Sequence, residues 1–372
     1  MRAQSSSISF FHSHISPRAI ELVTEVLHSG WVNEGEMVRR FEASLTDVLG
    51  LRHPVTVNSG TSALHLALAL SGVRPGDEVI LPAQTFVATG LVVLMQGATP
   101  VFADIDPLTG VISPESIAEK ITPRTRAVIP VHWGGYPCDL DEIHAIAAAH
   151  ELSVIEDAAH ALGATYKGRP IGAISRFTAF SFQAIKHLTT GDGGALCCQN
   201  EEDAKAAVAR RWFGMDRAAR QPSLLGARGI DIKTLGYKYH MNNVAAAIGL
   251  GNLEDFPARL ARRRQIAAFY RSELEHCAGL QLLQLKPDRE HAYWLFTLLV
   301  DRREDFVRRL AERGIPTSVV DLRIDQNSVF GGPRALPGQA EFDQRQISIP
   351  LHENLSDSQV EWIVEAIKEV AG

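Results

Sequence analysis

Cysteine is scarce in this chain of 372 residues, and long hydrophobic runs are missing. The four cysteines are too few for a disulfide scaffold, and they lack the paired CxxC spacing of a zinc site. The longest apolar runs, such as Gly90–Met95, fall far short of the roughly 20 residues that a membrane-spanning helix needs. The first residues hold one arginine and no long apolar core, so we expect no signal peptide. These absences predict a cytoplasmic protein with free thiols and no membrane partner.

An excess of positive charge is also absent. The 37 lysines and arginines are outnumbered by 43 aspartates and glutamates, which gives a formal net charge of −6 and argues against a nucleic-acid partner. No GxGxxG follows a strand, no GxxxxGK[ST] occurs, and no tight ligand spacing suggests a metal site. Hydrophobic residues make up 45% and charged residues 22%, which is typical of a globular protein, and the length favours two or three domains.

The first two-thirds of the chain alternates short apolar strands with amphipathic helices. Strands flanked by helices pair in parallel, and continuous apolar runs imply burial on both faces. We therefore predict an α/β fold, with a large three-layer domain over residues 1–245 built on an open, mostly parallel sheet of seven strands. The strands that the pattern marks are 78–81, 100–105, 126–131, 152–156, 176–182 and 194–198.

A smaller α+β domain is predicted over residues 246–372. A long helical stretch crosses a break at Pro257 and carries a basic run, 259–265, which we interpret as a solvated helix face whose arginines could also meet a nucleotide diphosphate. Strands are expected over 293–300, 315–320 and 346–350, and a helix over 304–313. The last helix begins at a capping box formed by Ser356 and Gln359.

Three features suggest chemistry. Lys186 follows a buried strand beside glycines, although a surface loop lysine would look the same. Asp157 ends another strand, where ligands of parallel sheets bind, although it could instead cap a helix. The segment Ser59–Ser62 begins an apolar helix and offers free N–H groups to an anion, although plain capping is the alternative. Together the three supply a phosphate site, a carboxylate for a pyridinium and a lysine for a Schiff base, which are the parts that pyridoxal 5′-phosphate (PLP) needs.

Several motifs then point to one family. The segments SGTSALHLAL, PGDEVILPAQTFVAT, EDAAHALGA, FSFQAIKHLTTGDGGAL, GYKYHMNNVAAAIGL and SIPLHENLSD occur in this order. From about Gly30 to the C-terminus the chain resembles the DegT/DnrJ/StrS nucleotide-sugar aminotransferases, PLP enzymes with the aspartate-aminotransferase fold (fold type I).

The resemblance implies roles for named residues. Lys186 would form the aldimine with PLP and shuttle protons, and Asp157 would keep the pyridine nitrogen protonated. His160, where the family often has Gln, would bond the phenolic oxygen, and Phe86 would stack on the ring. The phosphate would be bound by Gly60, Thr61, Ser62 and Ser181. His240 would reach the phosphate in a neighbouring subunit, which implies a homodimer with shared active sites.

The substrate contacts are predicted less directly. Trp31 could line the sugar pocket or pack in the core or a dimer contact, and Arg323 is a candidate for the nucleotide diphosphate. The chain departs from the family pattern at His187, at His240 and in DQNSVF (325–330). Relatives with His at the lysine position are dehydratases, so the presence of Lys186 favours transamination.

The resemblance implies ping-pong transamination of a nucleotide-linked 4-keto- or 3-keto-6-deoxysugar. Glutamate is the expected amino donor, and pyridoxamine 5′-phosphate is the intermediate cofactor form. One alternative within this class is an aminocyclitol-precursor aminotransferase that uses glutamine. Another is a catalytically idle relative that serves as a regulatory subunit, which Lys186 and Asp157 disfavour.

Overall fold

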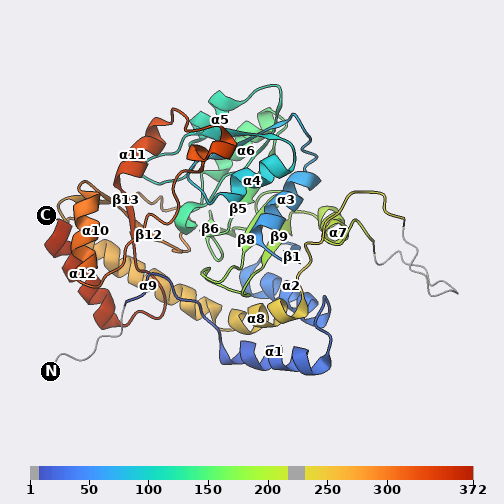
Figure 1. Cartoon of the computed structure of the whole chain (residues 1–372), viewed down its shortest axis with the longest axis horizontal. Helices are drawn as coiled ribbons and strands as arrows, with labels where there is room; N and C mark the ends of the chain where they lie inside the picture. The colour runs from blue at the N-terminus through green and yellow to red at the C-terminus, as the bar shows by residue number, and fades with distance from the viewer. Residues whose placement is uncertain (1–7, 217–230, 372) are drawn as a thin grey trace.

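The core of the protein is a seven-stranded sheet (Figure 1). The computed structural model describes residues 8–216 and 231–371. Neighbouring strands follow the order β1-β9-β8-β5-β4-β2-β3; β9 pairs antiparallel with both β1 and β8, and the other pairs in this sheet are parallel. This confirms the predicted open, mostly parallel sheet. The strands are β1 (Pro54–Val57), β2 (Glu78–Pro82), β3 (Thr99–Ala103), β4 (Thr125–Val128), β5 (Ser153–Asp157), β8 (Phe177–Ser181) and β9 (Gly194–Cys198).

Helices cover both faces of this sheet, as a three-layer fold requires. Along β2, Val79 and Leu81 belong to one buried cluster and Ile80 to another, because successive side chains point to opposite faces. The first cluster includes side chains of α3 (Gly60–Leu70), α4 (Ala88–Met95) and α7 (Glu201–Arg210). The second includes side chains of α1 (Pro17–Ser29), α2 (Glu36–Leu49), α5 (Pro114–Lys120), α6 (Leu140–Ala149) and α8 (Asn243–Leu253).

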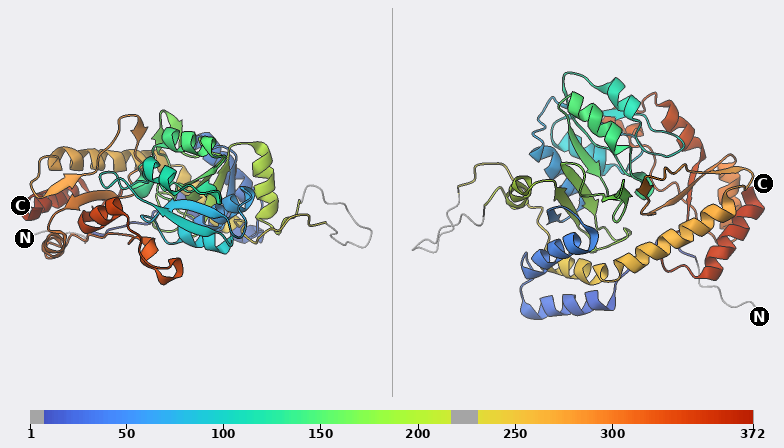
Figure 2. Two further views of the ribbon diagram at one scale, coloured as in Figure 1. Left: turned by 90° about the horizontal axis from the view of Figure 1, so that it is seen from above. Right: turned by 180° about the vertical axis from the view of Figure 1, so that it is seen from behind.

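Helix α8 packs on α1 and α2, and α9 (Phe256–Leu274) leads from there to the C-terminal elements (Figure 2). The predicted break at Pro257 is confirmed, since Pro257 lies in the first turn of α9. Ile266, Tyr270 and Leu274 of α9 belong to a third hydrophobic cluster, formed with the C-terminal strands and helices. The division of the chain near residue 245 stays a prediction.

The C-terminal part is the predicted α+β unit. Its antiparallel sheet has the order β10-β12-β13, and the capping box of the last helix is confirmed, because Gln359 N donates to Ser356 Oγ (3.2 Å) and Ser356 N to Gln359 Oε1 (3.0 Å). Its elements are β10 (Leu280–Leu282), β12 (Phe296–Val300), α10 (Arg303–Ala311), α11 (Pro337–Arg345), β13 (Gln346–Ile349) and α12 (Asp357–Ala371). A small sheet elsewhere joins β6 (Thr165–Tyr166), β7 (Arg169–Pro170) and β11 (Arg289–Glu290).

Two predictions for this part were wrong. Residues 315–320 do not form a strand, because pairing is limited to one bridge between Ser318 and Ser348 and the chain turns at Val320, whose φ is 63°. The basic run is not a solvated face throughout, since Arg259 and Arg263 are only 8% and 3% exposed. Both guanidinium groups contact the buried carboxylate of Glu353, at 3.3 and 2.8 Å, and this pairing is what allows the charges to be buried.

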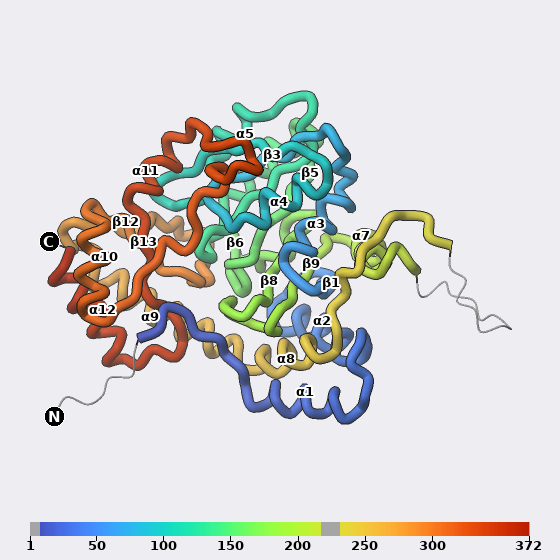
Figure 3. The backbone as a smooth tube through the Cα atoms, viewed as in Figure 1, coloured from blue at the N-terminus to red at the C-terminus, as the bar shows by residue number. Residues whose placement is uncertain are grey.

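The N-terminal segment 8–15 crosses between the two parts of the molecule (Figure 3). Ser9 Oγ lies 3.3 Å from His352 Nε2 in the C-terminal part, whereas Ser13 Oγ donates to the carbonyl of Ala184 (2.7 Å) beside the large sheet. Between them, the ring of Phe11 stacks on Trp294, with centroids 5.4 Å apart. Within residues 8–216 and 231–371, no helix is long and apolar enough to cross a membrane.

Candidate active site

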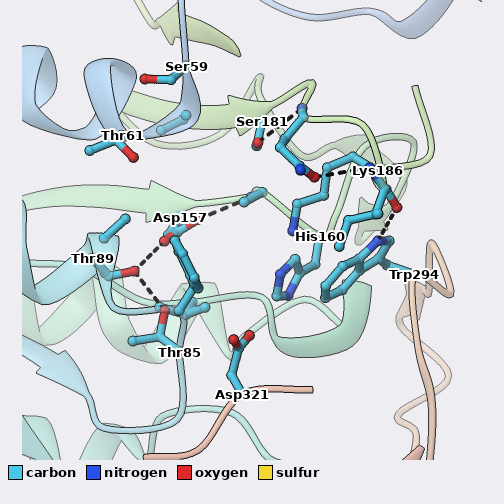
Figure 4. A pocket seen from close by; sticks show the side chains of 18 of the residues that line it. Ser59, Thr61, Thr85, Thr89, Asp157, His160, Ser181, Lys186, Trp294 and Asp321 are labelled. Atoms are coloured by element: carbon cyan, nitrogen blue, oxygen red, sulfur yellow. Dashed lines mark hydrogen bonds between the residues drawn. The ribbon is translucent and has the colours of Figure 1, made fainter. Parts of the chain in front are cut away.

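A cavity of about 450 Å³ lies at the carboxyl ends of β1, β2, β4, β5 and β8 (Figure 4). Ligands of parallel sheets bind at this edge. The C-terminal part adds Trp294 and Asp321 to the lining, and the N-terminal segment adds Phe11. Seven of the residues singled out from the sequence meet here: Gly60, Thr61, Phe86, Asp157, His160, Ser181 and Lys186.

Asp157 is buried at the end of β5 and is fixed by two hydrogen bonds. Thr89 Oγ1 on α4 donates to Asp157 Oδ2 (2.7 Å), and the backbone N–H of Ala159 donates to Oδ1 (3.1 Å). Thr85 Oγ1 lies 2.7 Å from Thr89 Oγ1, which holds the Thr89 hydroxyl in place. Burial raises the pKa of Asp157, and the hydrogen bond from Thr89 opposes that rise. The carboxylate is therefore oriented before any ligand arrives.

Lys186 lies in the turn that follows β8. Its Nζ is 3.7 Å from the centre of the Trp294 ring, and Trp294 Nε1 donates to the carbonyl of the preceding residue, Ile185 (3.0 Å). Burial lowers the pKa of Lys186 from 10.5 to about 8, and the negative charges of Asp321 and Asp157 oppose the decrease. A lysine whose pKa lies near neutrality can exchange protons and act as a nucleophile, which an ordinary surface lysine does poorly.

His160 presents a neutral imidazole to the cavity. Burial lowers its pKa well below the ordinary value of 6.5, and the charge of Lys186 acts in the same direction. The ring stacks on Trp294, with centroids 3.8 Å apart and planes 20° from parallel. Within the described ranges, Nδ1 is buried without a hydrogen-bond partner. A neutral imidazole has one donor and one acceptor nitrogen, so it suits an oxygen atom of a ligand.

The start of α3 forms the wall of the cavity on the side of β1. Ser59 caps the helix by accepting from Ser62 N (3.0 Å), and neither Gly60 N nor Thr61 N donates to an acceptor in the described part of the chain. Ser181, at the end of β8, faces this helix end so closely that a Cβ on Gly60 would lie 2.9 Å from Ser181 Cβ. Two free N–H groups and a hydroxyl on one side of a cavity can bind an anion.

Four of the residues named from the sequence lie outside the cavity lining. The Ser62 hydroxyl donates to Asn58 Oδ1 (2.6 Å). His240 Nε2 lies 2.8 Å from Asn33 Oδ1, beside β1. Trp31 is 66% exposed on a separate surface recess, and its indole N–H donates to the carbonyl of Glu34.

Arg323 is the fourth of these residues. Its guanidinium forms a bidentate ion pair with Asp325, in which Nε donates to Oδ1 (2.6 Å) and Nη2 to Oδ2 (2.7 Å). The same guanidinium also donates to the carbonyl of Arg334. Asp325 is fully buried, so Arg323 neutralises a buried charge within the C-terminal part.

Sequence reasoning missed three contributors to the site, namely Thr89, Trp294 and Asp321. Thr89 belongs to no motif of its own, and its spacing of four from Thr85 is the only sequence signal that both hydroxyls lie on one side. Trp294 and Asp321 come from loops of the C-terminal part, and no local motif shows which loops will reach the large sheet. Only the folded arrangement brings them to Lys186 (Figure 4).

Comparison with known proteins agrees with this geometry. The model of the DegT/DnrJ/EryC1/StrS aminotransferase family matches residues 13–368. The spore coat polysaccharide biosynthesis protein SpsC of Bacillus subtilis (strain 168) is 40% identical over 369 residues, which cover 96% of this chain and 95% of SpsC.

Solved structures agree as well. The structure of AtS13 from Actinomadura melliaura matches with a TM-score of 0.93 at 40% identity, and the match covers 99% of this chain and 100% of AtS13. The sugar aminotransferase CalS13 from Micromonospora echinospora matches with a TM-score of 0.92 at 37% identity, covering 97% of this chain and 99% of CalS13. The chain therefore belongs to the DegT/DnrJ/EryC1/StrS aminotransferase family and is a PLP-dependent sugar aminotransferase.

Proposed function

We propose that this enzyme transfers an amino group from glutamate to a nucleotide-linked 4-keto- or 3-keto-6-deoxysugar. The observation that carries the proposal is the convergence of Lys186, Asp157, His160 and the start of α3 on one cavity. Each of these groups has a chemical state that the reaction needs: a lysine with a lowered pKa, an oriented carboxylate, a neutral imidazole and free N–H groups.

The lining residues fit PLP. The N–H groups of Gly60 and Thr61, with the Ser181 hydroxyl, would bind the phosphate, and Ser62 would act by completing the cap of α3. Asp157 would bond the pyridine nitrogen, and His160 the phenolic oxygen. Phe86 lines the same cavity and is 56% exposed, so its ring is available to cover the cofactor.

When bound, PLP supplies an electron sink for the carbon that carries the amine. The chain's own residues do the rest. Lys186 accepts the proton from that carbon of the donor and later delivers a proton to the sugar carbon. Asp157, held by Thr89, keeps a negative charge beside the ring nitrogen. One lysine that serves both half-reactions delivers both protons from the same side of the cavity.

We further propose a homodimer in which His240 contributes to the site of the neighbouring subunit. Supporting this, Phe86 at the cavity and Leu322 and Val329 on the nearby C-terminal loops are more than half exposed. Apolar side chains gathered beside a cofactor site favour an interface. Trp31 and the nucleotide would lie at the same contact. Because Arg323 is paired with Asp325, its guanidinium would have to bind a diphosphate while it keeps that ion pair.

The free cysteines support a reducing compartment, and we place the enzyme in the cytoplasm.

The main experiment compares wild type with Lys186→Ala and with Lys205→Ala, whose side chain is 75% exposed. Each purified protein is loaded directly with pyridoxamine 5′-phosphate and offered a panel of nucleotide ketosugars, and the appearance of the PLP absorbance is recorded. We expect wild type and Lys205→Ala to react and Lys186→Ala to lose at least about 10⁴-fold in rate. Glutamate and glutamine are compared in the reverse half-reaction.

Two results would contradict the proposal. Turnover by Lys186→Ala at the wild-type rate would remove the lysine from its assigned role. A wild-type enzyme that accepts amino donors but no nucleotide ketosugar would overturn the substrate class. For the dimer, mixed subunits of Lys186→Ala and His240→Ala should recover activity that neither variant has alone, and the absence of recovery would contradict shared sites.

A further inference from the structure

Asp321 is held in the cavity by a strained turn of the C-terminal part. The preceding residue, Val320, has a φ of 63°, which is a rare and strained conformation for a β-branched residue. The turn is fixed by bonds from Val320 N to Ser318 Oγ (2.9 Å) and from Asp321 N to the carbonyl of Val319 (2.8 Å). Ser318 is in turn bonded in both directions to Ser348 of β13.

Packing alone does not account for the strained turn, because Val320 is only partly buried against the hydrophobic core. The residue after Asp321, Leu322, is 60% exposed, so the turn leaves an apolar side chain in solvent. Asp321 itself is half-buried and lines the cavity, and its carboxylate points into the same space as Lys186 and His160 (Figure 4). Strained backbone of this kind persists where the surrounding structure holds a functional group in position.

Of the two carboxylates that are at least partly buried in the cavity lining, that of Asp321 lacks a hydrogen-bond donor in the described part of the chain. The carboxylate of Asp157 accepts from Thr89 and from Ala159, whereas no hydrogen bond reaches the Asp321 carboxylate from residues 8–216 or 231–371. Lys186 is the one lysine or arginine in the described lining. Because a partly buried carboxylate without donors is costly, the site favours a ligand that brings a donor.

We propose that Asp321 is a substrate-binding residue that accepts a hydrogen bond from a sugar hydroxyl and thereby sets which ketosugar the enzyme takes. The assignment rests on the proposed function. A sugar offers several hydroxyl donors, whereas the two carboxylates of glutamate would be repelled by a carboxylate at this place. The Trp294 ring beside it supplies an apolar surface, and pockets of this composition use few polar groups to fix orientation.

The test separates the two half-reactions of the holoenzyme in single-turnover experiments. Asp321→Asn and Asp321→Ala should lower kcat/KM of the ketosugar half-reaction by about 10–100-fold, which is the worth of a hydrogen bond to a charged group. The amino-donor half-reaction should stay within about twofold of wild type, or become faster as the repulsion is removed. Asp301→Asn is the matched control, because its side chain is 65% exposed in the same part of the chain, and it should change neither half-reaction.

A second comparison varies the substrate. Ketosugars that lack one hydroxyl at a time are offered to wild type and to Asp321→Ala. For one of these deoxy sugars, kcat/KM of wild type should fall by the same factor as the Asp321→Ala substitution causes with the full ketosugar. Asp321→Ala should lose nothing further with that deoxy sugar, because removing the hydroxyl and removing the carboxylate abolish the same contact. Titration calorimetry with the amino-sugar product should show the same pattern in Kd.

Each outcome decides between the claims. A loss confined to the ketosugar half-reaction, absent for the matching deoxy sugar, supports the assignment. Wild-type turnover with an unchanged ketosugar half-reaction in both variants overturns the assignment alone. A loss confined to the donor half-reaction would show that Asp321 binds the donor's ammonium group instead. If wild type accepts no ketosugar at all, the proposed function fails and the assignment falls with it.

Discussion

The amino group of Lys186 lies over the indole ring of Trp294, 3.7 Å from the ring centre. The ring attracts the ammonium form, and the indole N–H also holds the carbonyl of Ile185. A residue of the C-terminal part thus positions both the side chain and the backbone of a lysine that follows β8. The turn that carries Lys186 must therefore pack against the C-terminal part for the lysine to reach its position in the cavity.

Substitution of Trp294 should separate these two contributions. Trp294→Phe keeps a ring near Lys186 but loses the hydrogen bond to Ile185, so we expect a cost of about 1 kcal/mol in the free energy of unfolding. Trp294→Leu also loses the ring, and we expect a further fall in kcat of roughly 2–30-fold. Thermal unfolding and steady-state kinetics measure the two effects. Trp362→Leu, at a side chain 39% exposed on α12, is the control for tryptophan loss. Equal kcat in the Phe and Leu variants would argue against a role for the ring.

The lowered pKa of Lys186 predicts a pH-dependent stability of the cofactor-free protein. Below pH 8 the buried lysine is charged in both the folded and unfolded states, so folding bears the cost of burying the charge. Between about pH 8 and 10.5 the unfolded chain still binds a proton that the folded protein has released, so this lysine makes stability rise with pH.

Lys186→Met should therefore raise the free energy of unfolding at pH 7 by about 1–3 kcal/mol and make much less difference at pH 10. Denaturant unfolding of wild type and variant at the two pH values measures this. Taking the difference between wild type and Lys186→Met at each pH removes the contributions of the other lysines and tyrosines, which titrate in both proteins. A difference that is the same at both pH values would mean that the charge of Lys186 is not the cause.

The hydrogen bond from Thr89 to Asp157 should control the acidic side of the activity profile. Thr89→Val removes a donor that opposes the burial-raised pKa of Asp157, so that pKa should rise further. We expect kcat to fall about tenfold and the acidic limb of the pH–rate profile to move to higher pH. Thr85→Val is the matched control, because it removes the Thr85–Thr89 bond but leaves the bond to Asp157. An unmoved acidic limb in Thr89→Val would show that Asp157 does not set it.

The buried pairing of Glu353 with two arginines should be a large stabilising element. Burial raises the pKa of Glu353, but the charges of Arg263 and Arg259 outweigh it and lower the pKa overall. Glu353→Gln leaves the buried guanidinium of Arg263 without a counter-charge and leaves Arg259 with Asp255 as its remaining acidic partner, so we expect a loss of about 3–5 kcal/mol in the free energy of unfolding at pH 7. The stabilisation is present above the ordinary glutamate pKa and is lost as the pH falls below it, so the difference should shrink at acidic pH.

Chemical denaturation at pH 7 and at pH 4 or below measures this, with Glu201→Gln as the control. Glu201 forms an exposed pair with Lys205, and its replacement should leave stability unchanged.

Arg259 also donates to the carbonyl of His187 (2.7 Å), the residue after Lys186. Arg259→Met should therefore lower kcat as well as stability, and full activity in that variant would show that this contact does not position the lysine.

The large sheet could be predicted from the sequence because its signals are local. The continuous apolar runs of β2, β5 and β9 mark buried strands wherever they lie, and the caps at Ser113, Asn200 and Ser356 mark helix starts. Segment 315–320 shows the limit of such signals: its β-branched residues favour a strand, but the chain turns at Val320 to place Asp321.

The site could be predicted only where one motif carries the residue. Lys186, Asp157 and the start of α3 each follow a strand of the large sheet, so their convergence follows from the parallel topology. Trp294 and Asp321 reach the cavity through the docking of the C-terminal part, which depends on Arg259, Arg263 and Glu353. In the sequence those arginines look like solvent-exposed residues, because Glu353, whose carboxylate neutralises them in the folded protein, lies far along the chain.

The N-terminal segment 8–15 constrains the order in which the parts of the site can form during folding. Ser9 contacts His352, and Asn354 lies 2.6 Å from His12, so the first described residues are held by residues about 340 positions later in the chain. Domains commonly fold from the N-terminus as they emerge from the ribosome. Here the large sheet could form early, but Phe11 could take its place in the cavity wall only after the C-terminal strands are present. A chain whose C-terminal strands had not yet been made would therefore lack this part of the cavity wall, and the site would be completed only once those strands have folded.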